Sequence, residues 1–211
     1  MTKAPRGRPR AFDRARALRQ AMDVFWTLGY EGAKLTDLQT AMGGITAPSF
    51  YAAYGSKEQL FREAVELYSS TLGAPMIAAL AEQPTARAAI AGLLEAAAAA
   101  FSKPGKPRGC MLVVAAMNSA PDATTVRDYL HSLRTRRRRL ILERLARGVR
   151  AGELPSGVDP SSLASFYSTL MDGLAIQARD GAPRSALNLT VRCAMASWDT
   201  AVAEARKGRG R

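Results

Sequence analysis

The stretch FWTLGYEGAKLTDLQTAMGGITAPSFYAAYGSKEQLFREAV, residues 25–65, contains two short segments of helical spacing on either side of a glycine pair. We expect the first helix to begin after Thr36, as an N-cap residue, and to end at Gly43-Gly44. The second begins near Thr46. Two short helices joined by a tight glycine-containing turn describe a helix-turn-helix, whose second helix lies in the major groove of DNA.

Helical spacing continues on both sides of this stretch. Apolar residues recur every three or four positions after Asp13, which predicts a supporting helix that Asp13 caps and Gly29 ends. Ser56 is the expected cap of a longer helix, and no segment shows the alternation of a strand, so the fold class is all-α. Further helices are expected at roughly 75–82, 85–101, 109–119, 122–151, 160–180 and 184–206.

The composition narrows the class of protein. The chain has 211 residues, 47% of them apolar, and a net charge of +12, which favours a polyanionic partner such as nucleic acid or a membrane surface. Cys110, Cys193 and His131 are isolated, a spacing that excludes a zinc finger and predicts no metal site. We find no carboxylate pair, nucleophile elbow or phosphate-binding loop, so neither an enzyme nor a cofactor is expected.

The sequence contains neither a secretory signal nor a membrane span. Its N-terminus is rich in arginine and proline and lacks an apolar core. No apolar run approaches the ~18–20 residues that a span requires. We therefore expect a cytoplasmic protein with no membrane partner.

The helix-turn-helix residues also resemble one known family in their identity and order. Leu18–Leu67 closely resembles the DNA-binding domain of the tetracycline-repressor (TetR) family of bacterial regulators. More weakly, Gly109–Ala116 and the later run DGLAIQARDGA resemble pieces of the sensor domains of one subgroup. The residues that carry the resemblance are Phe25, Gly29, Tyr30, Thr36, Leu38, Ala41, Phe50, Tyr51, Tyr54 and the run Lys57-Glu58-Gln59-Leu60-Phe61.

The resemblance implies a division of the chain into an N-terminal three-helix helix-turn-helix domain and a larger helical domain for ligand binding and dimerisation. Basic segments at both ends are expected to be disordered. The expected boundaries are 1–11 for the basic arm, 12–57 for the DNA-binding domain, 58–206 for the larger domain and 207–211 for the basic tail.

The second short helix carries small and hydroxyl-bearing residues and lacks Arg, Asn and Gln, so small polar and apolar contacts must select the bases. The turn Gly43-Gly44-Ile45 holds one residue more than the usual turn of the family, which bears on how this helix enters the groove. The resemblance implies that Thr36 and Lys57 contact phosphates, that Ala47, Pro48 and Ser49 face bases, and that Tyr51 and Tyr54 reach the backbone or base edges. Thr46 offers a further hydroxyl for DNA binding.

The N-terminal arm adds a second candidate contact with DNA. Arg6, Arg8 and Arg10 lie in a run that resembles the Gly-Arg-Pro core found in A·T minor grooves, where a narrow groove deepens the negative potential. The alternative is a solubilising terminus that touches phosphates loosely.

Candidates for a ligand cavity lie in the larger domain. Arg137 falls near the inner face of a long helix, where a charge is expensive to bury without a partner. It either extends to solvent, the interpretation we favour, or faces a pocket and binds an anionic ligand. Arg134, Arg138 and Arg139 are expected to lie on the solvated face of this helix, and Cys110 to be a small core residue, with a redox-sensing thiol as the alternative. The apolar candidates, for which core packing is the alternative, are Phe101, Met111, Met117, Phe166 and Met171.

The last two predicted helices carry broad apolar faces. The resemblance implies that they pair with their counterparts in a second copy as a four-helix bundle. The candidate residues of this dimer interface are Leu170, Leu174, Leu187, Val191, Met195 and Trp198.

These features predict a homodimeric regulator that binds a palindromic operator in double-stranded DNA. The resemblance implies repression that an unidentified small-molecule effector relieves, by changing the separation of the two reading helices. The alternative is a ligand-independent architectural protein that coats DNA without choosing a sequence.

Overall fold

The computed structural model describes residues 13–117 and 124–207. In these two ranges the regular structure is helical and no strand occurs, as the predicted all-α fold requires. The helices are α1 (Arg14–Gly32), α2 (Leu35–Ala41), α3 (Ala47–Tyr54), α4 (Lys57–Thr71), α5 (Ala74–Glu82), α6 (Ala86–Phe101), α7 (Met111–Met117), α8 (Thr124–Arg150), α9 (Pro160–Arg179) and α10 (Arg184–Lys207).

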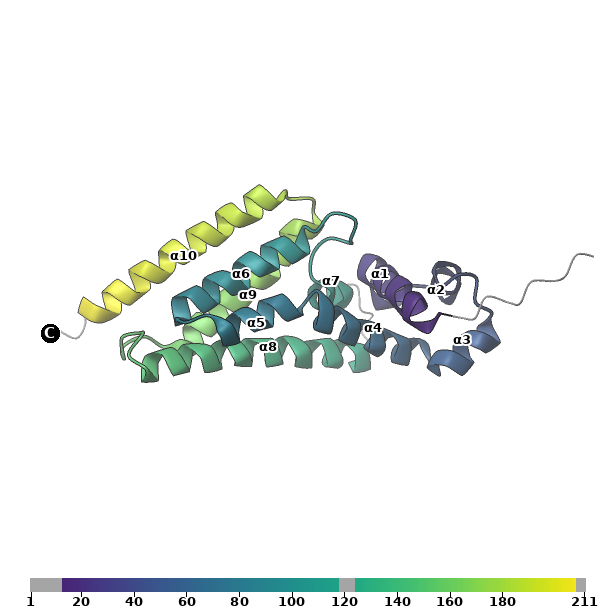
Figure 1. The fold of residues 1–211 in the computed structure, drawn as a ribbon, viewed down its shortest axis with the longest axis horizontal. Helices are drawn as coiled ribbons and strands as arrows, with labels where there is room; N and C mark the ends of the chain where they lie inside the picture. The colour runs from purple at the N-terminus through teal and green to yellow at the C-terminus, as the bar shows by residue number, and fades with distance from the viewer. Residues whose placement is uncertain (1–12, 118–123, 208–211) are drawn as a thin grey trace, which may run out of the picture.

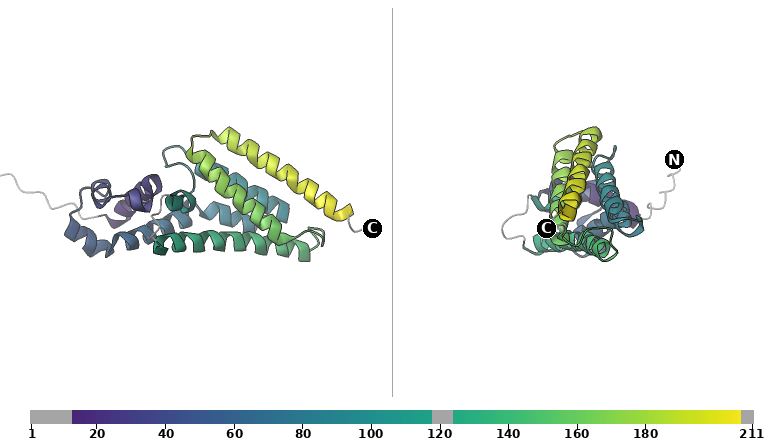
Figure 2. Two further views of the ribbon diagram at one scale, coloured as in Figure 1. Left: turned by 180° about the vertical axis from the view of Figure 1, so that it is seen from behind. Right: turned by 90° about the vertical axis from the view of Figure 1, so that its left-hand side faces the viewer.

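The molecule is elongated, with the short helices α2 and α3 at one end (Figure 1). α1, α2 and α3 form this smaller part, while α5, α6, α8, α9 and α10 form the larger one (Figures 1 and 2). α4 leads from the first part into the second, and α7 packs on α1 as well as on α8 and α9. The two parts are therefore joined by α4, which runs from one into the other, and by α7, which packs on helices of both.

A helix that spans a membrane must be both long and apolar. None of the helices in the described ranges is by itself long and apolar enough to span a membrane. α4 and α5 reach the required length and composition only as a pair, with a bend of 44° between them.

Short polar side chains set the start of several helices. Asp13 and Ser56 cap α1 and α4 as the sequence predicts, and Thr46, near the predicted start of α3, caps that helix. Each of the three accepts a hydrogen bond from a backbone N–H of the first turn. Thr85 and Asp159 cap α6 and α9 in the same way. These caps satisfy amide groups that have no partner inside the helix.

The start of α2 corrects one prediction. Thr36 is not the N-cap, because α2 begins at Leu35 and its N-cap is Lys34. The Asp37 carboxylate reaches back and accepts the Lys34 N–H at 3.0 Å, a contact that an acidic side chain makes from the third helical position. Thr36 therefore lies within the first turn, with its side chain exposed.

α1 contains a break at Gly29. The φ of 75° and ψ of 175° at this residue fall where side chains other than glycine are strained. Gly29 thus interrupts the helix as predicted, but α1 resumes and ends at Gly32. Arg179, in the last turn of α9, donates to the carbonyls of Trp26 and Thr27 before the break, at 3.2 and 2.8 Å.

Aromatic side chains fill the core of the smaller part. The rings of Phe25 and Phe61 meet edge to face with centroids 5.0 Å apart, and Tyr30 meets Phe61 at 5.1 Å. Phe25, Phe50 and Phe61 have no exposed surface. Because Phe61 belongs to α4, this helix is part of the small core as well as of the larger part.

The apolar face of α10 packs on α6 and α9 of the same chain. Most of the residues predicted for the dimer interface are consequently core residues of a single chain. Helical spacing identified their common face correctly but does not say which neighbour that face meets. The residues that are buried in this way are Leu174, Leu187, Val191, Met195 and Trp198.

The outward faces of α9 and α10 carry a different set of residues. Phe166 and Leu189 are 46% and 54% exposed, and Leu170 is half-buried. Gly173 on α9 has open space where a Cβ would stand. These side chains, rather than the inward ones, are available to a second copy.

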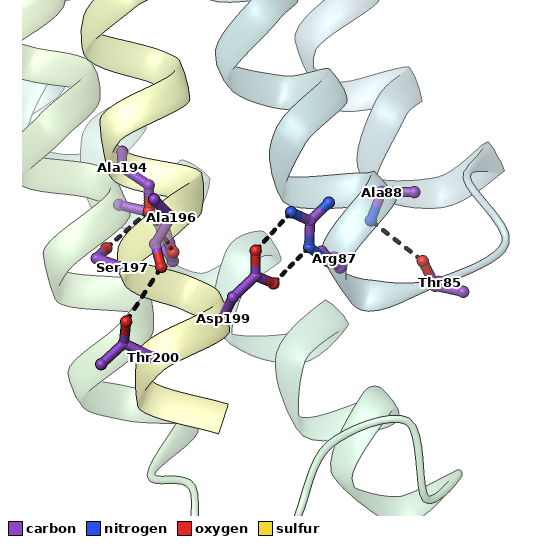
Figure 3. A network of polar contacts seen from close by, with 9 residues as sticks. Thr85, Arg87, Ala88, Ala194, Ala196, Ser197, Asp199 and Thr200 are labelled. Atoms are coloured by element: carbon purple, nitrogen blue, oxygen red, sulfur yellow. Dashed lines mark hydrogen bonds and ion pairs between the residues drawn. The ribbon is translucent and has the colours of Figure 1, made fainter. Parts of the chain in front are cut away.

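A pair of ionic hydrogen bonds connects α10 to the start of α6 (Figure 3). Arg87 Nε and Nη2 donate to the two carboxylate oxygens of Asp199, at 2.8 and 2.9 Å. Beside this pair, the Thr85 hydroxyl accepts the Ala88 N–H at 3.1 Å and caps α6. The hydrogen bonds from Arg87 lower the pKa of the Asp199 carboxyl.

Candidate nucleic-acid interface and candidate ligand cavity

α3 presents one exposed face and one buried face. Phe50 points into the small core without any exposed surface, whereas Tyr51 is 51% exposed. Thr46, Pro48 and Ser49 are also exposed, and Ala47 is half-buried. The predicted base-facing residues are therefore brought together on the first turn and a half of a helix, as a reading surface requires.

The hydroxyls at the start of α3 are hydrogen-bonded to each other. Thr46 Oγ1 donates to Ser49 Oγ at 3.0 Å and also accepts the Ser49 N–H at 3.4 Å. Pro48 occupies the first turn, where its missing N–H leaves no partner unsatisfied. This arrangement fixes two small polar side chains at the exposed start of α3.

The turn before α3 depends on two consecutive glycines. Gly43 and Gly44 both have positive φ, 93° and 78°. The Gly44 N–H donates to the Gln39 carbonyl at 2.9 Å, which closes the turn on α2. The additional residue noted in the sequence is thus accommodated by left-handed backbone, which glycine adopts without strain.

Tyr54 corrects a second prediction. It is 3% exposed, so it packs inside the smaller part and does not face DNA. Its hydroxyl donates to the Arg14 carbonyl at 3.2 Å, and the Arg14 guanidinium lies 4.8 Å from the ring centroid. Burial raises the pKa of this phenol. Tyr54 therefore connects the end of α3 to the start of α1.

Lys57 lies half-buried at the first position of α4, after the end of α3. Its ammonium lies 4.5 Å from the centroid of the Tyr30 ring. Burial lowers the pKa of Lys57. The side chain is thus positioned by the small core at the edge of the candidate reading surface.

A hollow beside α3 brings in residues that the sequence did not single out. It is bordered by the start of α1, by the glycine turn and by Thr46, Ser49 and Ala52 of the α3 segment. Arg16 and Gln20 of α1 line it, and Arg16 is exposed. In the sequence Arg16 is only one of many basic residues, because nothing local shows that α1 lies beside α3. Arg6, Arg8 and Arg10 lie outside the described residues.

A separate cavity of about 210 Å³ lies in the larger part, between the end of α4, α5, the start of α7 and α8. Of the predicted ligand-binding residues whose side chains the structure describes, Arg137 alone lines it. The walls are formed by Met76, Ile77, Leu112, Leu133 and Leu140, with the polar side chains of Tyr68, Ser69, Cys110, Arg136 and Arg137.

The other predicted cavity residues lie elsewhere. Phe101, Met111 and Met171 are fully buried core residues, the alternative stated for them above. Phe166 is exposed on the outer face of α9, so the prediction that it lines a ligand cavity is wrong. The side chain of Met117 lies outside the described part of the chain.

Arg137 is buried, at 8% exposure, so the favoured expectation that it extends to solvent is wrong. Its Nη2 donates to the carboxylate of Asp172 on α9, which supplies the compensating charge. The sequence does not reveal this pairing, because the two residues stand 35 positions apart. Arg137 Nε has no hydrogen-bond partner within residues 13–117 and 124–207.

The neighbouring arginines divide between protein and solvent. Arg134 is half-buried and donates to the Leu112 carbonyl at 2.7 Å, contrary to the expected solvated position, and burial lowers its pKa. Arg138 and Arg139 are exposed as predicted. Arg134 thereby links α8 to α7 next to the cavity.

Cys110 is 2% exposed and lines the cavity just before α7. This matches the expected core position, and the redox-sensing alternative stays a prediction. The guanidinium of Arg108 donates to the carbonyls of Ala178 and Ala182, so its hydrogen bonds go to the end of α9. Among the described residues, no group of three or more His, Cys, Asp or Glu side chains is arranged to hold a metal ion.

Several known proteins are similar to this chain. A family model described as the tetracyclin repressor-like C-terminal domain matches residues 86–194. The HTH-type transcriptional repressor ComR of Escherichia coli (strain K12) is 35% identical over 181 residues, which are 85% of this chain and 86% of ComR. The HTH-type transcriptional repressor BdcR of the same strain is 29% identical over 176 residues, 83% of each chain.

Solved structures share the fold along nearly the whole chain. A cysteine mutant of the TetR family transcriptional regulator CifR, complexed with 26-bp double-strand operator DNA, has a TM-score of 0.85 and 46% sequence identity. That match covers 90% of this chain and 100% of the CifR chain. A putative TetR transcriptional regulator from Rhodococcus sp. RHA1 has a TM-score of 0.59 and 36% identity, over 88% of this chain and 98% of its own.

Proposed function

This chain belongs to the tetracycline-repressor (TetR) family of transcriptional regulators, and from that premise we propose that it represses transcription by binding operator DNA as a homodimer. It is a regulator and not an enzyme. The names of the curated relatives ComR and BdcR as repressors support repression, and the operator DNA bound to CifR supports the partner. We place the protein in the cytoplasm, where it meets that DNA.

The observation that carries this proposal is the exposed start of α3. Thr46, Pro48, Ser49 and Tyr51 lie together on a surface that the buried Phe50 fixes to the small core. Short hydroxyls and a proline ring fit base edges and thymine methyl groups in a major groove. Thr36 on α2 and Lys57 on α4 flank α3 and are the proposed phosphate contacts, with Arg16 as an addition.

We propose that residues 12–57 form the DNA-binding domain and that residues 58–206 form the domain for ligand binding and dimerisation. We propose that a second copy packs on the outward faces of α9 and α10. The exposed side chains of Phe166 and Leu189, with Leu170 and the open surface at Gly173, support this site. An isologous contact of this kind gives the two readers that a palindromic operator requires.

An effector bound in the cavity would act through α4. The far end of this helix lines the cavity with Tyr68 and Ser69, and its near end contributes Phe61 to the small core. A ligand that fits only one position of α4 therefore shifts the population of spacings between the two reading helices.

Selection from random duplexes tests this function. The purified protein is mixed with a pool of random double-stranded DNA at about 150 mM salt, since phosphate contacts alone weaken steeply there, and the retained DNA is sequenced. We expect one palindrome with half-sites about one helical turn apart, or slightly more. Recovery of no motif, with binding that vanishes as salt rises, would instead support the architectural protein that coats DNA.

The role of Arg16 is tested with a matched pair of variants. Arg16→Gln should weaken operator binding and reduce the salt slope by about one, because one phosphate contact is lost. Arg150→Gln, an exposed arginine at the distant end of α8, is the control and should change neither quantity. Equal effects of the two variants would show that Arg16 acts only through net charge.

A further inference from the structure

We propose that the cavity binds a compact, neutral and mostly apolar molecule that carries one hydrogen-bond-accepting oxygen, and that the Tyr68 hydroxyl donates to that oxygen. This inference rests on the proposed function, because it names the class of effector for the site described above. It also assigns Tyr68 as the residue that selects that effector.

The size of the cavity limits the ligand. A cavity of roughly 150 Å³ lined by apolar side chains holds benzene. The present cavity, at about 210 Å³, therefore suits a single ring with one small substituent. Met76, Ile77, Leu112, Leu133 and Leu140 provide an apolar wall for such a ring.

Tyr68 supplies an unused donor to this cavity. The residue is 1% exposed, and no described residue meets its hydroxyl in full hydrogen-bond geometry, although the Cys110 thiol and the Met111 N–H lie near it. The Cys110 thiol lies beside it, and burial together with this thiol raises the pKa of Tyr68 well above its ordinary value, so the phenol keeps its proton. A buried donor without a partner destabilises the fold. An acceptor oxygen on a ligand removes that penalty, which makes the hydroxyl a recognition group.

The charge balance of the cavity favours a neutral ligand. Arg137 is the buried cation of the wall, and its charge is already paired with Asp172. A carboxylate in the cavity would have to compete with Asp172, which already neutralises that cation, so little charge remains to offset the cost of burying a second anion. Arg136, the other cation of the wall, is exposed and solvated. The Nε–H of Arg137 has no partner among the described residues, so it is a second hydrogen-bond donor in the wall but adds no further charge.

The Tyr68 ring also touches the smaller part of the molecule. It meets Trp26 of α1 edge to face, with centroids 4.9 Å apart. Trp26 is fully buried and precedes the break at Gly29. Binding of a ligand at the Tyr68 hydroxyl should therefore change the fluorescence of Trp26. The chain contains one other tryptophan, Trp198.

The test uses two probes of the same shape. Acetophenone carries a carbonyl oxygen where α-methylstyrene carries a CH₂ group, so only the first accepts a hydrogen bond. Binding of each to the full-length protein is measured by titration calorimetry. Trp26 fluorescence in the Trp198→Phe variant gives a second readout. We expect acetophenone to bind roughly three- to tenfold more tightly than α-methylstyrene, the range that one hydrogen bond provides.

Tyr68→Phe isolates the hydroxyl, because the ring that packs on Trp26 is kept. In this variant acetophenone should lose its advantage, while α-methylstyrene should bind as before. Tyr129→Phe, a half-buried tyrosine of α8 outside the cavity wall, is the matched control and should leave both affinities unchanged.

Three results would overturn the proposal: equal binding of the two probes, binding of neither, or tighter binding of benzoate than of acetophenone, which would show an anion site. Operator selection with the same preparation separates this failure from failure of the proposed function. A recovered palindrome without probe binding rejects the effector class and leaves the regulator intact.

Discussion

The two ends of α4 are packed in opposite ways. At the start of the helix, Phe61 completes an aromatic core with Phe25 and Tyr30, and the rings of Phe25 and Phe61 have no exposed surface. At its end, Tyr68 borders a cavity whose wall contains buried donors without partners in the described ranges. One end is closed by apolar contact, and the other retains space and hydrogen-bonding capacity. One helix therefore connects the proposed DNA-binding part to the proposed ligand-binding part.

The largest expected loss of stability follows a substitution near the start of α4, in the aromatic core. Phe61→Ala should lower the free energy of unfolding by about 3–5 kcal/mol, because a fully buried ring leaves a cavity that its neighbours fill only in part. Leu133→Ala at the cavity wall should lower it by only about 1 kcal/mol, because this side chain is half-buried and already borders empty space. Denaturant unfolding measures both, and equal losses would contradict the comparison.

The next effect concerns buried charge in the larger part. Arg144 has a side chain that is 2% exposed and pairs with Glu153 at 3.2 Å, and Glu153 also accepts the Ala86 N–H at the start of α6. Glu153→Gln should cost about 2–3 kcal/mol, since it leaves a buried cation without its partner charge but its own site is partly open to solvent. Glu143→Gln, which breaks the exposed pair with Arg139, should cost less than about 0.5 kcal/mol. A similar cost for both in chemical denaturation would show that Arg144 is stabilised by other groups.

At the end of α4 that borders the cavity, a substitution should change the free energy of unfolding by less and in the opposite direction. Without any ligand, Tyr68→Phe should leave stability unchanged or raise it by up to about 1 kcal/mol, because the hydroxyl it removes has no partner among the described residues. Tyr167→Phe should instead lower stability by about 1 kcal/mol, since that buried hydroxyl donates to the Ala194 carbonyl at 3.3 Å. Thermal unfolding of the two variants decides the matter, and a clear loss in Tyr68→Phe would mean that its hydroxyl is already satisfied.

The smallest effect depends on pH and lies on the surface. Hydrogen bonds from Arg87 lower the pKa of Asp199 from its ordinary value of 3.8, so this carboxylate stabilises the fold above pH 3.8 and loses that contribution as the pH falls through the lowered pKa. The Tm difference between the wild type and Asp199→Asn should therefore be small at neutral pH, should shrink as the pH falls below 3.8 and should disappear only below the lowered pKa of Asp199. A difference that persists unchanged in acid would assign the effect to packing and not to charge.

Local patterns predicted most of the helices and many of their ends. Asp13, Thr46 and Ser56 act as caps within three residues of their partners, so the sequence alone contains the whole interaction. Thr36 failed as a cap because the choice between adjacent start positions was decided by Asp37, whose carboxylate reaches the Lys34 N–H. The reading face of α3 followed from the same local reasoning, apart from Tyr54, whose burial depends on the distant Arg14.

Contacts between distant segments were not predictable in this way. Helical spacing groups Leu187, Val191 and Trp198 on one face, but a face that meets α6 and one that meets a second copy have the same apolar pattern. The burial of Arg137 depends on Asp172, and neither residue indicates the other in the sequence. For the same reason, Arg137 alone of the predicted ligand-binding residues with described side chains lies in the cavity wall.

The contact of Arg179 with α1 limits how the chain can be recombined. This arginine comes from α9, yet it donates to the carbonyls of Trp26 and Thr27 just before the break at Gly29. A chimera that joins α1–α4 to the sensor of another regulator would lose this contact unless the new sensor offers an arginine at the same place. The reader is therefore not an interchangeable cassette, and exchange of sensors should succeed only between chains that keep this docking residue.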